Sequence, residues 1–153
     1  MKNNILLHRI IVPGLVGTST MTLYSYLIAI AKGKNYKEPL LLGEMATRLL
    51  LLKENKHKQW TGWLLHYGVG LLFAELYAPW WKADASNRNL KTGLVLGGIS
   101  GLAAILIWKF TLTAHPLPPA VDFTGFAAVL FVAHLLFGVS AAVGYQICSN
   151  RRR

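Results

Sequence analysis

The sequence contains few charged side chains and a single cysteine, Cys148. Charged residues make up 14% of its 153 residues, against about 25% in soluble proteins, whereas 54% are hydrophobic. One cysteine excludes an internal disulfide and a cysteine-based zinc cluster. The sequence also lacks the motifs G-x-S-x-G and H-E-x-x-H and a glycine-rich phosphate loop. These absences disfavour hydrolase chemistry and predict a protein that is not an enzyme.

Acidic residues are scarce as well, because 16 lysines and arginines stand against only 6 aspartates and glutamates. The basic residues lie between and beyond long apolar runs, where they would meet lipid headgroups. This placement predicts contact with a lipid bilayer and no binding of nucleic acid. The basic residues divide evenly between the two predicted sides of the membrane, so the positive-inside rule assigns no orientation.

Four long apolar segments follow one another along the chain. About 20 apolar residues are needed to cross the hydrocarbon of a bilayer. The segments that meet this length are Ile10–Ala31, Thr61–Trp81, Leu90–Leu112 and Phe123–Ile147. Tryptophan and tyrosine flank the second segment at both ends, which is typical of aromatic belts at the two interfaces. The sequence therefore predicts an all-α integral membrane protein, a four-helix bundle formed as one domain by residues 1–153.

A shorter amphipathic segment, Glu38–Asn55, separates the first two predicted spans. Its apolar part, Leu40–Leu52, is too short to cross a bilayer. Glu44 and Arg48 lie one helical turn apart on its polar face, and lysines precede and follow it. This pattern predicts a helix that lies flat in the membrane interface. A surface for a protein partner is the alternative interpretation.

The second and fourth predicted spans share the pattern H-x3-G-x3-A-x2-Y. Positions i, i+4, i+8 and i+11 lie on one face of a helix, so each span carries a stripe of histidine, two small residues and tyrosine. The matched pairs are His66 and His134, Gly70 and Gly138, Ala74 and Ala142, and Tyr77 and Tyr145. The repeat predicts two similar helical hairpins, with both stripes facing the interior of the bundle.

Glycines recur in the last three predicted spans at helical spacing. Small residues at such positions let the backbones of neighbouring membrane helices approach closely. We therefore predict helix packing at Gly62, Gly70, Gly93, Gly97, Gly101 and Gly138.

Three histidines are candidates for a cofactor site. His66 and His134 are expected at similar depth in parallel helices, and the third span ends on the same side with His115. Neutral imidazoles ligate metal ions and the iron of haem, so a metal or haem site is one hypothesis, with the metal unknown. The competing hypothesis is structural, in which each histidine hydrogen-bonds a neighbouring helix, for example the Ser and Thr hydroxyls of the first span.

Glu75 is the acid well inside a predicted span. It follows His66 by about 2.5 helical turns, which places the two side chains on opposite faces of the helix and excludes a shared site. A carboxylate inside the membrane is a candidate for a proton or ion path. A proton-linked transporter of small solutes is therefore a third hypothesis, and its few helices would call for a homo-oligomer.

The chain also resembles a known family over about half of its length. The resemblance rests on Gly62-Trp63-x2-His66-x3-Gly70, on the glycine run from Gly93 to Gly101, and on His134-x3-Gly138 with Gly144-Tyr145. From Gly62 to Tyr145 these residues resemble small four-span bacterial inner-membrane proteins of the YagU-like kind. The resemblance implies a multi-pass protein of the bacterial inner (cytoplasmic) membrane. It implies no mechanism, because the function of that family is not settled.

The sequence favours a non-enzymatic function. The pattern is typical of a structural, regulatory or partner-binding membrane component, which would associate with a protein partner or with further copies of itself. The histidine site for a metal or haem and the proton-linked transporter remain the two alternatives.

Overall fold

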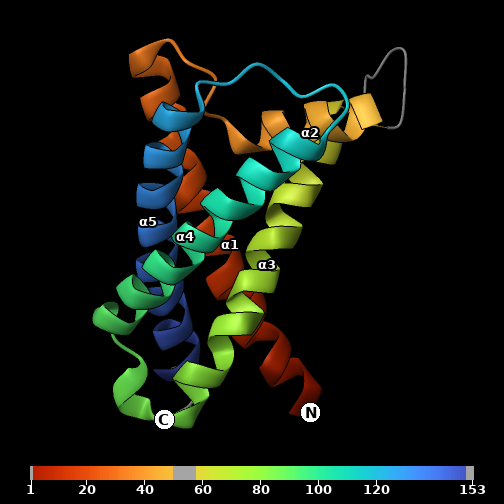
Figure 1. Ribbon diagram of the computed structural model, residues 1–153. Coiled ribbons are helices and arrows are strands. Elements are labelled where there is room, and N and C mark those ends of the chain that lie inside the picture. The colour runs from red at the N-terminus through yellow and green to blue at the C-terminus, as the bar shows by residue number, and fades with distance from the viewer. Residues whose placement is uncertain (1, 50–57, 151–153) are drawn as a thin grey trace.

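The structure is a computed structural model that describes residues 2–49 and 58–150. Within these two ranges every regular element is a helix and no strand is formed, which confirms the predicted all-α class. The elements in chain order are α1 (Lys2–Lys32), α2 (Glu38–Leu49), α3 (Lys58–Ala83), the short 3-10 helix η1 (Ala85–Asn87), α4 (Leu90–Ala114) and α5 (Phe123–Asn150) (Figure 1).

Three helices are long and apolar enough to cross a membrane. They are Arg9–Lys32 in α1, Leu90–Ala114 in α4 and Phe123–Ser149 in α5. The second predicted span, Thr61–Trp81, forms a helix of sufficient length within α3. Its tryptophans and tyrosines, together with His66 and Glu75, make α3 less apolar than the other three. The structure therefore supports three membrane-spanning helices by length and composition.

The four long helices follow an open order rather than a closed ring. α5 packs against both α4 and α1, and α1 packs in turn against α3. α3 and α4 stand at the two ends of this order and make few contacts with each other. Tyr77 of α3 joins them where its hydroxyl donates to the Leu96 carbonyl oxygen at 3.0 Å. Both ends of the described chain lie at the end of the bundle opposite α2 (Figure 1).

Glycines bring α4 and α5 into backbone contact. A Cβ atom on Gly97 would lie 2.5 Å from the His134 carbonyl oxygen, and one on Gly93 would lie 2.5 Å from the Gly138 carbonyl oxygen. A Cβ atom on Gly101 would also be crowded, at 3.2 Å from the Cβ of His134. The two helices pack this closely only because these positions have no side chains.

Gly33 ends α1 and lets the chain turn into α2. It adopts a φ of 59°, a left-handed conformation that glycine takes at little cost. The Lys34 N–H then donates to the Ala29 carbonyl oxygen at 3.1 Å and closes the last turn. α2 begins at Glu38 with Pro39 in its first turn, where the missing N–H of proline costs no hydrogen bond.

α2 lies across one end of the bundle and packs on α3 (Figure 1). Its far end is anchored to the segment that links α4 and α5, because Arg48 donates to the carbonyl oxygens of Leu117 at 3.1 Å and Pro118 at 2.9 Å. Arg48 also pairs with Glu44 one turn earlier, as the sequence predicts. The predicted helix extends to Asn55, and its residues 50–55 lie outside the described ranges.

Gly62 sets the distance between α2 and α3. A Cβ atom there would fall far inside van der Waals contact with the Pro39 carbonyl oxygen and 2.9 Å from the Gly43 nitrogen. We expect Gly62→Ala to push α2 away and to weaken its docking by about 1–3 kcal/mol. Amide hydrogen exchange in α2 should then speed up by about tenfold or more.

Gly68, on an outer position of the same helix, is the matched control for Gly62. A Cβ atom there would meet nothing within 4 Å. Gly68→Ala should therefore leave amide exchange in α2 unchanged. Equal exchange rates in the two variants would show that α2 does not depend on this contact.

Two groups of buried apolar side chains form the core. One group lies toward the end of the bundle away from α2 and includes Trp81, Phe137 and Tyr145. The other lies beneath α2 and includes Leu41, Trp108, Phe126 and Leu130. The functional site described below lies where the two groups meet.

Candidate functional site

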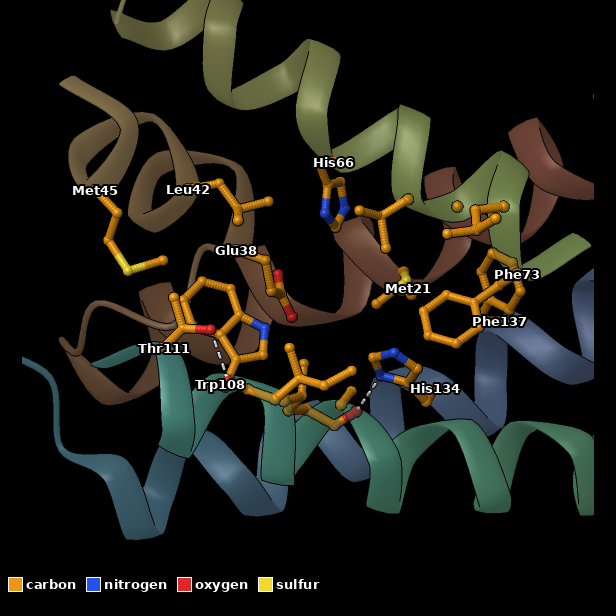
Figure 2. A pocket seen from close by; sticks show the side chains of 16 residues that line it. Met21, Glu38, Leu42, Met45, His66, Phe73, Trp108, Thr111, His134 and Phe137 are labelled. Carbon is orange, nitrogen blue, oxygen red and sulfur yellow. Dashed lines mark hydrogen bonds between the residues drawn. The ribbon is translucent and has the colours of Figure 1, made fainter. Parts of the chain in front are cut away.

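A cavity of about 270 Å³ lies inside the bundle beneath α2 (Figure 2). Residues from all five helices line it: Met21, Glu38, Leu42, Met45, His66, Val69, Gly70, Leu72, Phe73, Ala104, Ile107, Trp108, Thr111, Leu130, His134 and Phe137. Val69 and Leu72 of α3 and Ile107 of α4 are also exposed on the outer surface, at 45%, 55% and 59%. The cavity therefore reaches the apolar outer surface between α3 and α4, which make few contacts with each other.

Three titratable side chains interrupt this apolar lining. Glu38 comes from α2, His66 from α3 and His134 from α5, and Figure 2 shows all three directed into the same space. Their relative solvent exposures are only 1%, 6% and 4%, respectively. No lysine or arginine is among the lining residues. The structure thus brings together two of the three predicted histidines and adds a carboxyl group from α2.

His66 is held by α1. Its Nε2 lies 2.8 Å from Thr22 Oγ1, and the Thr22 hydroxyl itself donates to the Thr18 carbonyl oxygen at 2.6 Å. A hydroxyl has one hydrogen, so Thr22 must accept from His66 and the proton of the neutral imidazole resides on Nε2. Nδ1 of His66 is left with its lone pair.

His134 is held by its own helix. Its Nδ1 lies 2.9 Å from the Leu130 carbonyl oxygen, which only accepts, so the proton of this imidazole resides on Nδ1. Nε2 of His134 keeps its lone pair. Among the residues described, neither histidine makes a further hydrogen bond, so each presents one acceptor nitrogen.

Glu38 is the most deeply buried acid among the described residues. Ser25 of α1 donates to its Oε1 at 2.6 Å, while its Oε2 is buried with no hydrogen-bond partner in the described part of the chain. Burial raises the pKa of Glu38 to about 7, and the hydrogen bonds from Ser25 and from a backbone N–H only partly offset this. The carboxyl group is therefore poised to exchange a proton near neutral pH.

Aromatic rings form part of the apolar cavity wall. Phe73 packs edge-on against His134 with ring centroids 5.6 Å apart, and it lies 6.2 Å from Phe137 in a similar arrangement. Trp108 is fixed against Phe126 at 5.0 Å. These contacts hold the rings in place and leave an apolar surface that is largely preformed.

The structure separates His115 from the other two histidines. Its Nδ1 accepts from the Leu117 N–H at 3.0 Å, so its Nε2 donates to the Met45 carbonyl oxygen at 3.0 Å. The Nε2 hydrogen bond joins the end of α4 to α2, whereas Nδ1 is used within the segment that follows α4. His115 does not line the cavity.

Within the described ranges, no three side chains of the types His, Cys, Asp and Glu are placed to hold one metal ion. Glu38, His66 and His134 face one space without converging on a single point. The hypothesis that the histidines bind a metal or haem therefore rests on the two free imidazole nitrogens alone.

Glu75 lies apart from the cavity, as its spacing from His66 predicts. It occupies the exposed outer face of α3, whereas His66 is buried. The acid that does face the cavity, Glu38, has no site role in the sequence analysis, which assigns it to the amphipathic segment. One signal was present, because Glu38 is the single acid in a run of lysines and directly precedes a proline at a helix start.

The two repeat stripes occupy equivalent places in the fold. All eight matched residues of α3 and α5 are buried, from His66 to Tyr77 and from His134 to Tyr145. Gly70 is crowded against Thr18 of α1, and Gly138 against Gly93 of α4. Each stripe thus packs against a neighbouring helix and carries its histidine to the edge of the cavity.

Comparison with protein-family models, curated proteins and solved structures finds no match for this chain. The resemblance to YagU-like proteins accordingly stays a prediction from the motifs.

Proposed function

We propose that this chain is a multi-pass membrane protein that binds a small, largely apolar organic molecule in the cavity beneath α2. In this proposal α3 crosses the membrane together with α1, α4 and α5, which makes four spans. α2 lies in the membrane interface and covers the cavity. The tryptophans and tyrosines near both ends of α3 support its placement across the bilayer. The bacterial inner membrane is the proposed location, on the basis of the motif resemblance.

The observation that carries the proposal is the size and lining of the cavity. An apolar cavity of about 150 Å³ is enough to bind benzene in a soluble protein, and the volume here is about 270 Å³. Aromatic and aliphatic walls with a few polar groups are typical of sites for small organic ligands. An opening between α3 and α4 would let such a molecule enter from the lipid.

The lining residues suit a binding site better than a catalytic site. The hydroxyl of Thr111 already donates to the Ile107 carbonyl oxygen at 2.7 Å. The N–H groups of His66 and His134 are likewise engaged, at Thr22 and Leu130. Among the lining residues, none is a serine or cysteine activated by a neighbouring base, which a hydrolytic nucleophile requires. The favoured role therefore remains a non-enzymatic membrane component, now with a specific ligand site.

Photolabelling with a neutral aryl diazirine tests this function. Purified full-length protein in detergent should show a saturable labelled fraction that mass spectrometry places on the cavity walls, at Phe73, Trp108 or Thr111. Ala104 is buried at 6% and lines the cavity. We expect Ala104→Phe to fill the space and to lower the saturable fraction by about tenfold, since a volume-filling side chain competes with the ligand.

Leu102→Phe is the matched control. It adds a ring to the outer face of the same helix, where Leu102 is 59% exposed. This variant should keep the saturable labelling of wild type, and thermal unfolding of each variant should verify that it is folded. If Ala104→Phe does not fold, Ala104→Leu replaces it. Labelling of the wild type that never saturates, or that Ala104→Phe leaves unchanged, would exclude the cavity as a binding site.

A further inference from the structure

We infer that the ligand is a lipophilic ammonium ion, with its charged nitrogen against the Glu38 carboxylate and its apolar body against the aromatic wall. This inference rests on the proposed binding function and specifies the chemical class of the ligand.

Glu38 is a buried carboxyl group without a counter-ion among the described residues. Lys37, its neighbour in sequence, instead places its ammonium group 5.2 Å from the centre of the Tyr26 ring. In the described part of the chain no lysine or arginine forms an ion pair with Glu38. A buried carboxylate that lacks a partner is costly. A cationic ligand would supply both the missing charge and the hydrogen-bond donor that Oε2 lacks.

The other polar atoms of the cavity favour the same class of ligand. His66 and His134 have committed their N–H groups elsewhere, so each offers a lone pair to the cavity. Such acceptor nitrogens can bind the N–H groups of an ammonium ion, but they do not bind the oxygens of a carboxylate or phosphate. Among the described lining residues, the side-chain donor still available is the indole N–H of Trp108. One such donor does not compensate the repulsion between an anion and the Glu38 carboxylate. Fatty acids and other anionic lipids are therefore disfavoured.

The aromatic wall adds to the attraction of a cation. Phe73, Phe137 and Trp108 all line the cavity, and the faces of such rings attract ammonium groups. The apolar surface would bury the hydrocarbon part of the ligand. A bare metal ion lacks such a part, and the potential ligands among the described residues do not converge on one point.

Several titratable groups surround the carboxyl group of Glu38 and bear on the choice of conditions. Tyr26 of α1 interacts with it electrostatically, and His66 of α3 and His134 of α5 face the same cavity. The α4 residues on that wall carry no titratable side chain; they are Ala104, Ile107, Trp108 and Thr111. The test is best run at about pH 8, above the pKa of Glu38, where the carboxylate is ionised.

A competition experiment distinguishes the ammonium from a neutral ligand of the same shape. Phenylbutylammonium and pentylbenzene differ only by an ammonium group in place of a methyl group. Each is titrated against the neutral diazirine label on the full-length protein. We expect the ammonium to displace the label at a concentration about tenfold lower than the hydrocarbon, as a charge-assisted hydrogen bond would give. Glu38→Gln should abolish this preference while the neutral label still binds.

Glu75→Gln is the matched control, because it removes a carboxylate from the exposed face of α3. This variant should keep the preference for the ammonium. Equal competition by the two compounds, with saturable labelling intact, would overturn the inference and leave the proposed function standing. A preference that survives Glu38→Gln would also overturn it. Wild-type labelling that never saturates would instead overturn the proposed function itself.

Discussion

Replacement of Gly138 by alanine is expected to destabilise the protein by about 2–4 kcal/mol. A Cβ atom on Gly138 would lie 2.9 Å from the Gly97 Cα and closer still to the Gly93 carbonyl oxygen. Both obstacles are backbone atoms, which cannot rotate away as a side chain can. α4 and α5 would have to separate along their whole contact, and this contact is the most extensive in the fold.

Gly98→Ala provides the matched control on α4. The nearest atom to a Cβ there is the terminal Cδ2 of Leu135 at 3.6 Å, an ordinary contact with a flexible side chain. The free energy of unfolding should stay within about 0.5 kcal/mol of wild type, since alanine is also the better helix former. Unfolding in mixed detergent, followed by circular dichroism, measures both variants. Equal losses for Gly98→Ala and Gly138→Ala would contradict the close backbone packing.

The second large effect is a dependence of stability on pH that originates at Glu38. Burial raises its pKa from 4.5 to about 7 in the folded protein. A group whose pKa is raised on folding contributes its stabilisation fully below its unfolded pKa and loses it as the pH rises through the folded pKa. Stability should therefore fall between about pH 4.5 and pH 7, by roughly 3 kcal/mol in all for this one group.

Glu38→Gln isolates that contribution. Glutamine keeps the shape of the protonated carboxyl group and can still accept from Ser25, but it carries no titratable proton. Thermal unfolding temperatures measured across this pH range should decline for the wild type and vary less for the variant. His66 and His134 remain in both proteins, so the difference between the two curves reports Glu38. Parallel curves would mean that the carboxyl group is solvated rather than buried.

Much of the helical architecture follows from local rules that act along the chain. The lengths of the apolar runs predict where the long helices lie along the chain. The three helices that are apolar enough to span a membrane all correspond to predicted spans. α3 differs in composition from the other three long helices. Its aromatic belts and its inward-facing polar residues lower its mean hydropathy, which is the property that identifies the others as spans.

The histidine stripes show what helical periodicity can predict about the site residues. A period of 3.6 residues places His66 on the face of α3 that carries Gly70 and Tyr77, and the structure buries that face. The same period places Glu75 outside. The Ser and Thr hydroxyls of the first span were candidate partners, and the structure selects Thr22 for His66. Periodicity does not say which helix covers each face, so the contact of His115 with α2 could not be assigned beforehand.

The sequence by itself determined the helical class, the inward orientation of the two histidines and the positions where glycine is required. These properties depend on neighbours within one helix, whose geometry is set by the backbone. Only the tertiary structure decided that Glu38, 28 residues before His66, lines the same cavity. Its burial depends on how α2 packs on α3 and on its contact with Ser25 of α1. Desolvation of a carboxyl group arises from atoms distant in sequence, and no local pattern records them.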